Sequence, residues 1–227
     1  MIRKAGRGPV ARAAARRSVE ERRARERRQR THDVLATARG LFVKKGYDGA
    51  TMADIAAASG FAIGTLYELF PSKDTILLGL LEDRVDQLLG RLRDVAAREG
   101  ADPARQIADI VRTHLGFFRE DPALLRLTLT AWTGSDFTVR RDLGERIDRK
   151  HREYLALVLP VFERGVRGRV FARRPPMRMA VALTGLINAL IRRWVREPGL
   201  DLAAEGEGLL EIFFDGIRAA GRRRTMS

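Results

Sequence analysis

Cysteine is absent from the 227 residues, which excludes disulfides, thiolate metal sites and a cysteine nucleophile. Histidine is scarce, with three residues, and the sequence has no HExxH pair, phosphate-binding glycine loop or serine-nucleophile elbow. Asp148 and His151 could share a helix face, but the flanking arginines favour a surface ion pair. We therefore predict a protein that is not an enzyme, with no catalytic residues, no metal site and no cofactor.

Long apolar runs are also missing. A membrane-spanning helix needs about 20 consecutive apolar residues, and the best candidate, residues 180–191, is shorter and is interrupted by Thr184 and Asn188. No apolar stretch follows the basic N-terminus, which argues against a secretory signal. We expect a cytoplasmic protein that has no membrane partner and is associated with the nucleoid when bound to DNA.

Charge of one sign is in large excess. Lysine and arginine total 43 against 29 acidic residues, a net charge of +14. Residues 1–30 hold twelve of the cations and three glutamates, so nine of the fourteen excess charges lie there. Such a field attracts polyanions, nucleic acid first and an anionic membrane surface second. We predict a basic, disordered arm over residues 1–27. The alternative for its latter part, Val19 to Arg30, is a helix that continues into the first predicted helix, and whether the arm is only solvated or adds contacts to DNA is open.

Helical periodicity begins at about Thr31, and no alternating strand pattern occurs anywhere. Gly46 offers a C-terminal stop, and Thr51 with Asp54 resembles a capping box that opens a second helix. The fold class is therefore all-α, with about nine helices. Those after the second are expected over residues 62–69, 72–98, 103–119, 122–133, 137–166, 177–196 and 203–220.

The second and third short helices fit a helix-turn-helix. In this motif the crossing requires a small residue, the turn a glycine four positions later, and the next helix an apolar anchor six positions further. Ala56, Gly60 and Leu66 supply the three. The pattern alone is moderately specific, because alanine and glycine are common in this sequence.

The stretch from Thr51 to Asp74, TMADIAAASGFAIGTLYELFPSKD, resembles the signature of the tetracycline-repressor (TetR) family. The matching features are Thr followed by Ile-Ala, a glycine turn, Gly-Thr-Leu-Tyr, a terminal aromatic and Ser-Lys-acid. The resemblance spans about residues 28–80. It implies a three-helix helix-turn-helix head over residues 28–74 and a larger helical ligand-binding and dimerisation body over residues 75–227.

Residues at the start of a recognition helix enter the major groove, which assigns Ala62, Ile63, Gly64 and Thr65 to base edges or the groove wall. Ala62 departs from the family pattern, since a capping residue usually stands there. We expect the DNA-binding residues to be Arg28, Arg30, Thr51, Ala62, Ile63, Gly64, Thr65, Tyr67, Glu68 and Lys73. By similarity, Thr51, Tyr67 and Lys73 contact phosphates, which fixes register without reading sequence. Glu68 is either a reader of cytosine or a solvated charge.

The last two helices are apolar on several sides, which fits either an intrachain core or a homodimer interface. The family resemblance implies the interface. Two-fold symmetry then predicts an inverted-repeat operator in double-stranded DNA. The candidate interface residues are Leu183, Leu186, Ile187, Leu190, Leu210, Phe213, Phe214 and Ile217.

The middle helices mix aromatic and polar residues, which indicates either ordinary core or a pocket for a hydrophobic or aromatic small molecule. The candidate pocket residues are His114, Phe118, Trp132 and Tyr154. The resemblance implies a repressor that releases DNA when the ligand binds. The alternative function is non-specific binding of nucleic acid by the basic arm.

Overall fold

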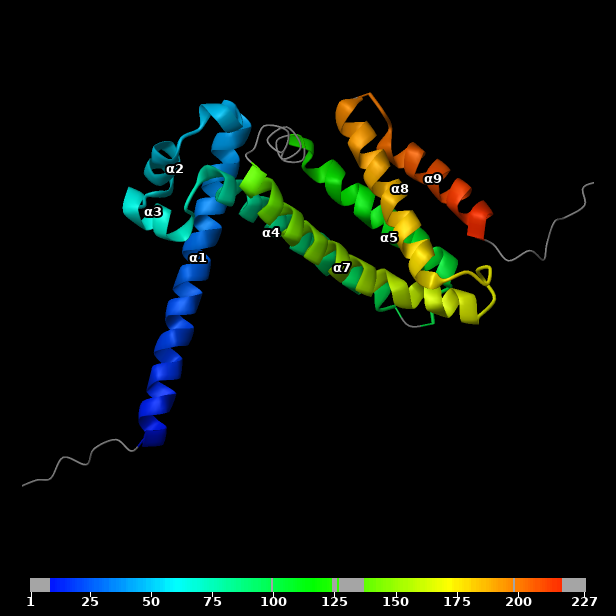
Figure 1. The fold of residues 1–227 in the computed structure, drawn as a ribbon, viewed down its shortest axis with the longest axis horizontal. Coiled ribbons are helices and arrows are strands. Elements are labelled where there is room, and N and C mark those ends of the chain that lie inside the picture. The colour runs from blue at the N-terminus through cyan, green and yellow to red at the C-terminus, as the bar shows by residue number, and fades with distance from the viewer. Residues whose placement is uncertain (1–8, 99, 124–125, 127–136, 198, 218–227) are drawn as a thin grey trace, which may run out of the picture. The chain divides into compact units, whose positions relative to one another are not determined.

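The computed structural model describes residues 9–98, 100–123, 126, 137–197 and 199–217. Every regular element in these residues is a helix, and none is long and apolar enough to cross a membrane. This confirms the predicted all-α fold (Figure 1). The elements are α1 (Pro9–Gly49), α2 (Met52–Ser59), α3 (Ile63–Leu69), α4 (Lys73–Ala96), α5 (Pro103–Glu120), α7 (Phe137–Arg167), α8 (Pro176–Arg196) and α9 (Leu202–Ile217).

The chain divides into two compact units between Leu77 and Leu78, close to the predicted boundary. We call them the head and the body. In the head, α1 packs on α2 and α2 on α3. Val34, Ala38 and Phe42 form the buried face of α1 at helical spacing, and Ile55 of α2 and Leu66 of α3 belong to the same core.

Helix α1 is broken at Gly46, which has φ 76° and ψ 167°. Positive φ costs glycine nothing sterically, so the chain leaves the helical path here and turns toward α2. The predicted glycine stop is thus confirmed.

The basic N-terminal segment is helical from Pro9 onward, which agrees with the helical alternative for residues 19–30 and differs from the disordered arm predicted over the residues before them. Alanine, arginine and glutamate all have high helix propensity. Arg22 and Glu26 also form an i,i+4 ion pair with an N–O distance of 3.7 Å. The prediction gave weight to net charge and too little to these local preferences.

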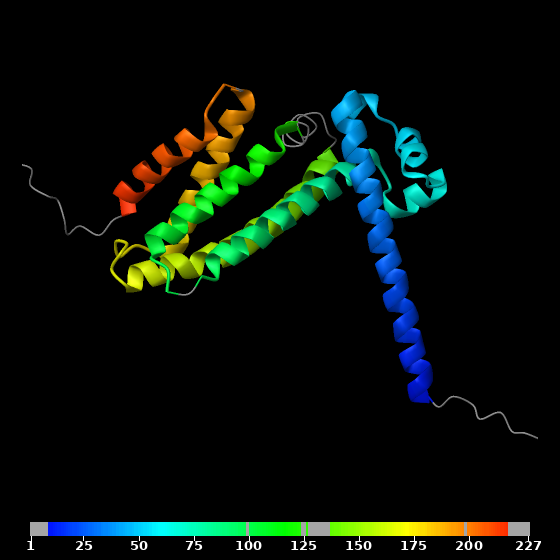
Figure 2. The same ribbon diagram turned by 180° about the vertical axis from the view of Figure 1, so that it is seen from behind.

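The body is a bundle in which α5 packs against α7, α8 and α9, and α8 packs against α7 and α9. Figure 2 shows α4 alongside α7 from behind, in agreement with Figure 1 and with ion pairs between the two helices. The core is continuous from Leu88 and Leu92 on α4, through Ile107 on α5, to Phe213 on α9. The helix predicted over residues 122–133 lies mostly outside the described residues.

Two long-range contacts tie the body together. The buried Gln106 side chain donates to the carbonyls of Val95 and Ala96, both at 2.9 Å, so α5 satisfies the C-terminal end of α4. After α7, Phe171 of the connector inserts its ring into the core and stacks on Phe214 at a centroid distance of 6.3 Å.

Candidate functional site

The head contains a helix-turn-helix with each of its three expected determinants. Ala56 is buried at the crossing, and Leu66 of α3 is fully buried as the anchor. Gly60 has φ 73° and ψ 16°, and its N–H caps α2 by donating to the carbonyls of Ala56 and Ala57. A side chain with a Cβ would be strained at this φ, so the sequence pattern of small residue, glycine and anchor reflects this geometry.

Thr51 and Asp54 form the predicted capping box at the start of α2. The Asp54 N–H donates to Thr51 Oγ1 at 3.1 Å, and the Thr51 N–H donates to Asp54 Oδ2 at 3.0 Å. Lys45 lies 3.0 Å from the Asp54 carboxylate. The Lys45 contact, followed by the bonds from Thr51, lowers the pKa of Asp54. Because Thr51 Oγ1 accepts in this box, its hydrogen can still be donated to a phosphate.

Helix α3 presents one face outward because Leu66 fixes the opposite face in the core. Ile63 and Tyr67 are 45% and 50% exposed, which is high for large apolar side chains. Ala62, Gly64 and Glu68 are also exposed, and Thr65 is half-buried. The structure therefore places the residues expected at the major groove on α3 and at its N-cap, whereas Arg28, Arg30, Thr51 and Lys73 lie on other elements of the head. Ala62 makes no side-chain cap bond, as its methyl group requires.

Lys73 is tied into the head by an aromatic residue that sequence reasoning missed. Its Nζ donates to the Tyr47 carbonyl at 2.7 Å and lies 4.3 Å from the centroid of the Tyr47 ring. The Tyr47 hydroxyl donates to the Asp74 carboxylate, and burial, then Asp74, raises the pKa of Tyr47. The one signal for Tyr47 in the sequence is its place directly after Gly46. Lys73 thus joins α4 to the end of α1, and its phosphate contact stays a prediction.

Arg28 and Arg30 lie on α1, and both are exposed. They continue a run of exposed arginines that starts at Arg22. Since the segment is helical, these cations lie on a regular scaffold rather than a coil. Their contact with DNA stays a prediction.

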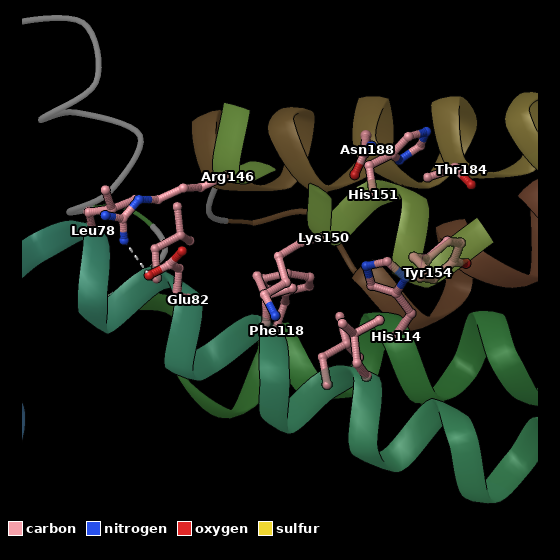
Figure 3. A pocket seen from close by; sticks show the side chains of 14 residues that line it. Leu78, Glu82, His114, Phe118, Arg146, Lys150, His151, Tyr154, Thr184 and Asn188 are labelled. Carbon is pink, nitrogen blue, oxygen red and sulfur yellow. Dashed lines mark hydrogen bonds and ion pairs between the residues drawn. The ribbon is translucent and has the colours of Figure 1, made fainter. Parts of the chain in front are cut away.

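The body contains a cavity of about 150 Å³ between α4, α5, α7 and α8 (Figure 3). Three of the four predicted pocket residues line it: His114, Phe118 and Tyr154. The His114 ring lies 5.4 Å from both the Phe118 and the Tyr154 ring centroids. Trp132 lies outside the described residues. The sequence-based prediction missed the remaining lining residues: Leu78, Leu81, Glu82, Val85, Leu88, Leu89, Arg146, Lys150, His151, Thr184 and Asn188.

Two buried polar atoms of this cavity have no hydrogen-bond partner in the described structure: His114 Nδ1 and Tyr154 Oη. Burial lowers the pKa of His114 to about 4, so its imidazole is neutral at pH 7. Burial also raises the pKa of Tyr154, against an opposing effect of the Thr184 hydroxyl. That hydroxyl donates its own hydrogen to the Ala180 carbonyl at 2.8 Å and does not meet hydrogen-bond geometry with Tyr154.

The charged residues of the cavity are paired with one another or with neighbours. Arg146 donates to Glu82 at 2.8 Å, the interaction drawn as a dashed line in Figure 3. Lys150 lies 2.6 Å from Asp86 and 3.2 Å from Glu153. The hydrogen bond to Asp86, and to a smaller extent the bond to Glu153, raises the pKa of Lys150. The ion pairs therefore leave little unbalanced charge around the cavity.

The structure divides the predicted dimer residues. Five of them lie in the core of the body itself, which is the alternative that the sequence left open, because a fully covered side chain has no surface for a second copy. These five are Leu183, Ile187, Leu190, Leu210 and Phe213. Leu186 is 40% exposed, Phe214 is half-buried, and the Ile217 side chain lies outside the described residues.

Residues 34–80 match the family described as bacterial regulatory proteins, tetR family. The fatty acid metabolism regulator protein of Bacillus subtilis (strain 168) is 23% identical over 195 residues, covering 85% of this chain and 98% of that protein. Two solved structures share the fold. A transcriptional regulator of the TetR/AcrR family from Thermobifida fusca has a TM-score of 0.65 at 21% identity, covering 86% of this chain and all of that one. The transcriptional regulator FadR from Bacillus subtilis, in complex with stearoyl-CoA, has a TM-score of 0.67 at 22% identity, covering 82% and 99%.

The matched segment begins inside α1 and ends inside α4, so it contains the whole helix-turn-helix. The helical body extends the likeness over most of the chain. Residues 34–80 therefore carry the DNA-binding head of the tetR family of bacterial regulatory proteins, and the chain as a whole shares its fold with solved regulators of that family.

Proposed function

We propose that the protein is a ligand-responsive repressor that binds an inverted-repeat operator as a homodimer. The observation that carries the proposal is the exposed face of α3, where Ile63 and Tyr67 stand out beside Gly64 while Leu66 fixes the helix from behind. Helices of this kind read the major groove from their first residues. With few hydrogen-bond donors at its tip, α3 would read thymine methyls through Ala62 and Ile63, or the shape of the DNA.

The homodimer is supported by an uncovered apolar strip on the last two helices. The exposed residues of α8 between Met179 and Ile191 carry no charge, and Ile212 of α9 is 74% exposed. A strip of this kind on a surface is the usual mark of a protein interface. We name it the α8–α9 face; its residues are Val181, Ala182, Gly185, Leu186, Ala189 and Ile212. We assign the contact between subunits to the α8–α9 face in place of the five core residues. Leu186 is the residue shared by this face and the interface predicted from the sequence.

The ligand response is supported by the cavity in the body. Its wall on α4 is made by Leu78, Leu81 and Leu88, among other apolar side chains, which suits a hydrophobic or aromatic effector. The related FadR structure contains stearoyl-CoA, a ligand with a long apolar chain. An effector that binds better to the form with low DNA affinity would release the operator. Bound operator would in turn lower the affinity for the effector by the same factor. The repressor acts where the chromosome is, which places it in the cytoplasm.

The experiment is a selection of bound fragments from a random-sequence DNA pool by the purified full chain, at a stated salt concentration. Tyr67→Ala is the test variant, because Tyr67 is half exposed on α3. Val170→Ala is the matched control, an exposed apolar residue on the body. We expect one short inverted repeat with wild type and the control, and weaker enrichment of it with Tyr67→Ala. Fragments that share no sequence would reject the proposal and leave non-specific binding through the basic helix.

A further inference from the structure

The cavity of the body has two polar side chains that the protein itself leaves unsatisfied. His114 and Tyr154 are each 5% exposed, and neither His114 Nδ1 nor Tyr154 Oη has a hydrogen-bond partner in the described structure. The two rings meet edge to face at 5.4 Å and both line the cavity (Figure 3). Buried polar atoms are normally paired, so two orphans at one cavity indicate a missing partner.

The chemistry of the pair limits what that partner is. A neutral imidazole has one nitrogen that donates and one that accepts, and a phenol hydroxyl does both. A ligand hydroxyl can therefore pair with both residues, and a ligand carbonyl can accept from either. A hydrocarbon can pair with neither and would leave both atoms unsatisfied.

The charges around the cavity argue against an ionised ligand. His114 is buried and neutral at pH 7, and the cations Arg146 and Lys150 already have carboxylate partners. A carboxylate placed beside His114 and Tyr154 would lose its hydration without gaining a counter-charge. An ammonium group would meet the same penalty, since Glu82 is paired with Arg146.

The size and the walls of the cavity define the rest of the ligand. Apolar side chains from α4 and Phe118 from α5 enclose the space next to the two orphan atoms. A cavity of about 150 Å³ lined by such residues accommodates a single benzene ring. A phenol with a short alkyl group matches this volume.

We propose that the cavity binds a small uncharged molecule with an apolar body and one hydroxyl or carbonyl oxygen, and that His114 and Tyr154 bind this oxygen. The inference rests on the proposed ligand response and names the chemical class of the effector. It also explains why two buried polar atoms without partners line this cavity.

The test is calorimetric titration of the DNA-free full chain with three probes of matched shape: para-propylphenol, propylbenzene and para-propylbenzoate. We expect the phenol to bind about tenfold more tightly than propylbenzene, the size of one satisfied buried hydrogen bond, and the benzoate to bind more weakly than the phenol. Tyr154→Phe should reduce the preference for the phenol over propylbenzene severalfold. The double variant with Tyr154→Phe and His114→Phe should show no preference for the phenol.

Tyr154→Phe also tests the orphan state of its hydroxyl directly. Removing an unpaired buried hydroxyl should leave the Tm of the free protein unchanged or raise it, whereas a purely structural hydroxyl would lower the Tm when lost. Equal affinity for phenol and propylbenzene, tightest binding of the benzoate, or no binding of any probe would overturn the inference. The proposed function fails separately, because sequence-selective DNA binding is measured without any probe.

Discussion

Lys73 and Tyr47 bind each other twice in the head: the ammonium donates to the Tyr47 carbonyl at 2.7 Å and lies 4.3 Å from the centre of its ring. The lysine belongs to the first turn of α4, and the tyrosine follows the break in α1 at Gly46. The contact therefore holds the two ends of the helix-turn-helix frame together. A residue expected only to contact phosphate also has a structural role.

The Tyr47 hydroxyl should stabilise the head through Asp74. We expect Tyr47→Phe to lower the free energy of unfolding by about 1–2 kcal/mol, because a half-buried hydrogen bond to a carboxylate is lost. Urea unfolding of the full chain checks this. Tyr67→Phe is the control: that tyrosine is half exposed, so its stability should match wild type while its DNA affinity falls. Equal stability of both variants would contradict a structural role for Tyr47.

The recognition helix α3 has no side-chain hydrogen bond at its N-cap, so a capping residue there should increase the stability of the head. Ala62 stands in extended backbone geometry at the N-cap and makes no side-chain cap bond. We expect Ala62→Ser to raise the free energy of unfolding by about 1 kcal/mol, since serine can accept from the first N–H groups of α3. Thermal unfolding measures the gain. A Tm that falls would show that the site does not admit a cap.

Burial of neutral His114 predicts a loss of stability in acid. The pKa is about 4 in the folded chain against 6.5 for an ordinary histidine, so the unfolded chain binds the extra proton between these values. The contribution of neutral His114 to the free energy of unfolding is fully present above pH 6.5. It is lost as the pH falls toward 4, by about 3 kcal/mol in total. The slope of unfolding free energy against pH should be smaller for His114→Phe. Identical slopes would mean that His114 is accessible to protons in the native state.

Gly165 has no room for a side chain. A Cβ at this position would overlap the ring of Phe171, which is itself packed between Phe162 and Phe214. We expect Gly165→Ala to lower the free energy of unfolding by about 1–3 kcal/mol, the cost of forcing a packed core apart. Gly90→Ala on α4 is the control, because no atom lies within 4 Å of the position that its new methyl group would occupy, and the helix favours alanine. Destabilisation by both variants to the same extent would contradict the packing explanation.

The α8–α9 face should carry the dimer. Introducing a charge there with Ile212→Asp should yield single chains in sedimentation analysis and weaken operator binding, without loss of helical content. Val170→Asp places the same charge on another exposed apolar residue and should leave the dimer intact. A dimer that survives both Ile212→Asp and Leu186→Asp would place the interface elsewhere.

Features that depend on local chemistry were predictable from the sequence. The capping box at Thr51 appears with the expected bonds. Two other helix starts follow the same local rules: the Thr75 N–H donates to Ser72 Oγ, and the Ala104 N–H donates to Asp102 Oδ1 ahead of Pro103. Each is decided by residues within a few positions of one another, so the sequence contains the full information. The glycine turn at Gly60 belongs to the same class.

Features that depend on partners distant in the chain were not predictable. Tyr47 and Lys73 are 26 residues apart, and their contact requires the head to be folded. An apolar helix looks the same in sequence whether it is covered by its own chain or by a second one, which is why Leu183 and Ile187 were expected at the dimer interface and lie in the core. The pocket was found in part because His114 and Tyr154 are unusual in a helix core, whereas the leucines opposite them read as ordinary packing.

Sequence specificity is the central claim, and its most direct measurement is a ratio of two affinities. The inverted repeat recovered by selection is compared with a duplex of equal length in which both half-sites are scrambled. Both affinities are measured by fluorescence anisotropy at physiological salt and at a second, higher salt concentration. We expect the intact repeat to bind at least about 1,000-fold more tightly, the lower bound for specific regulators. Affinities within a few-fold of each other, both falling steeply with salt, would contradict the claim and assign binding to the basic N-terminal helix alone.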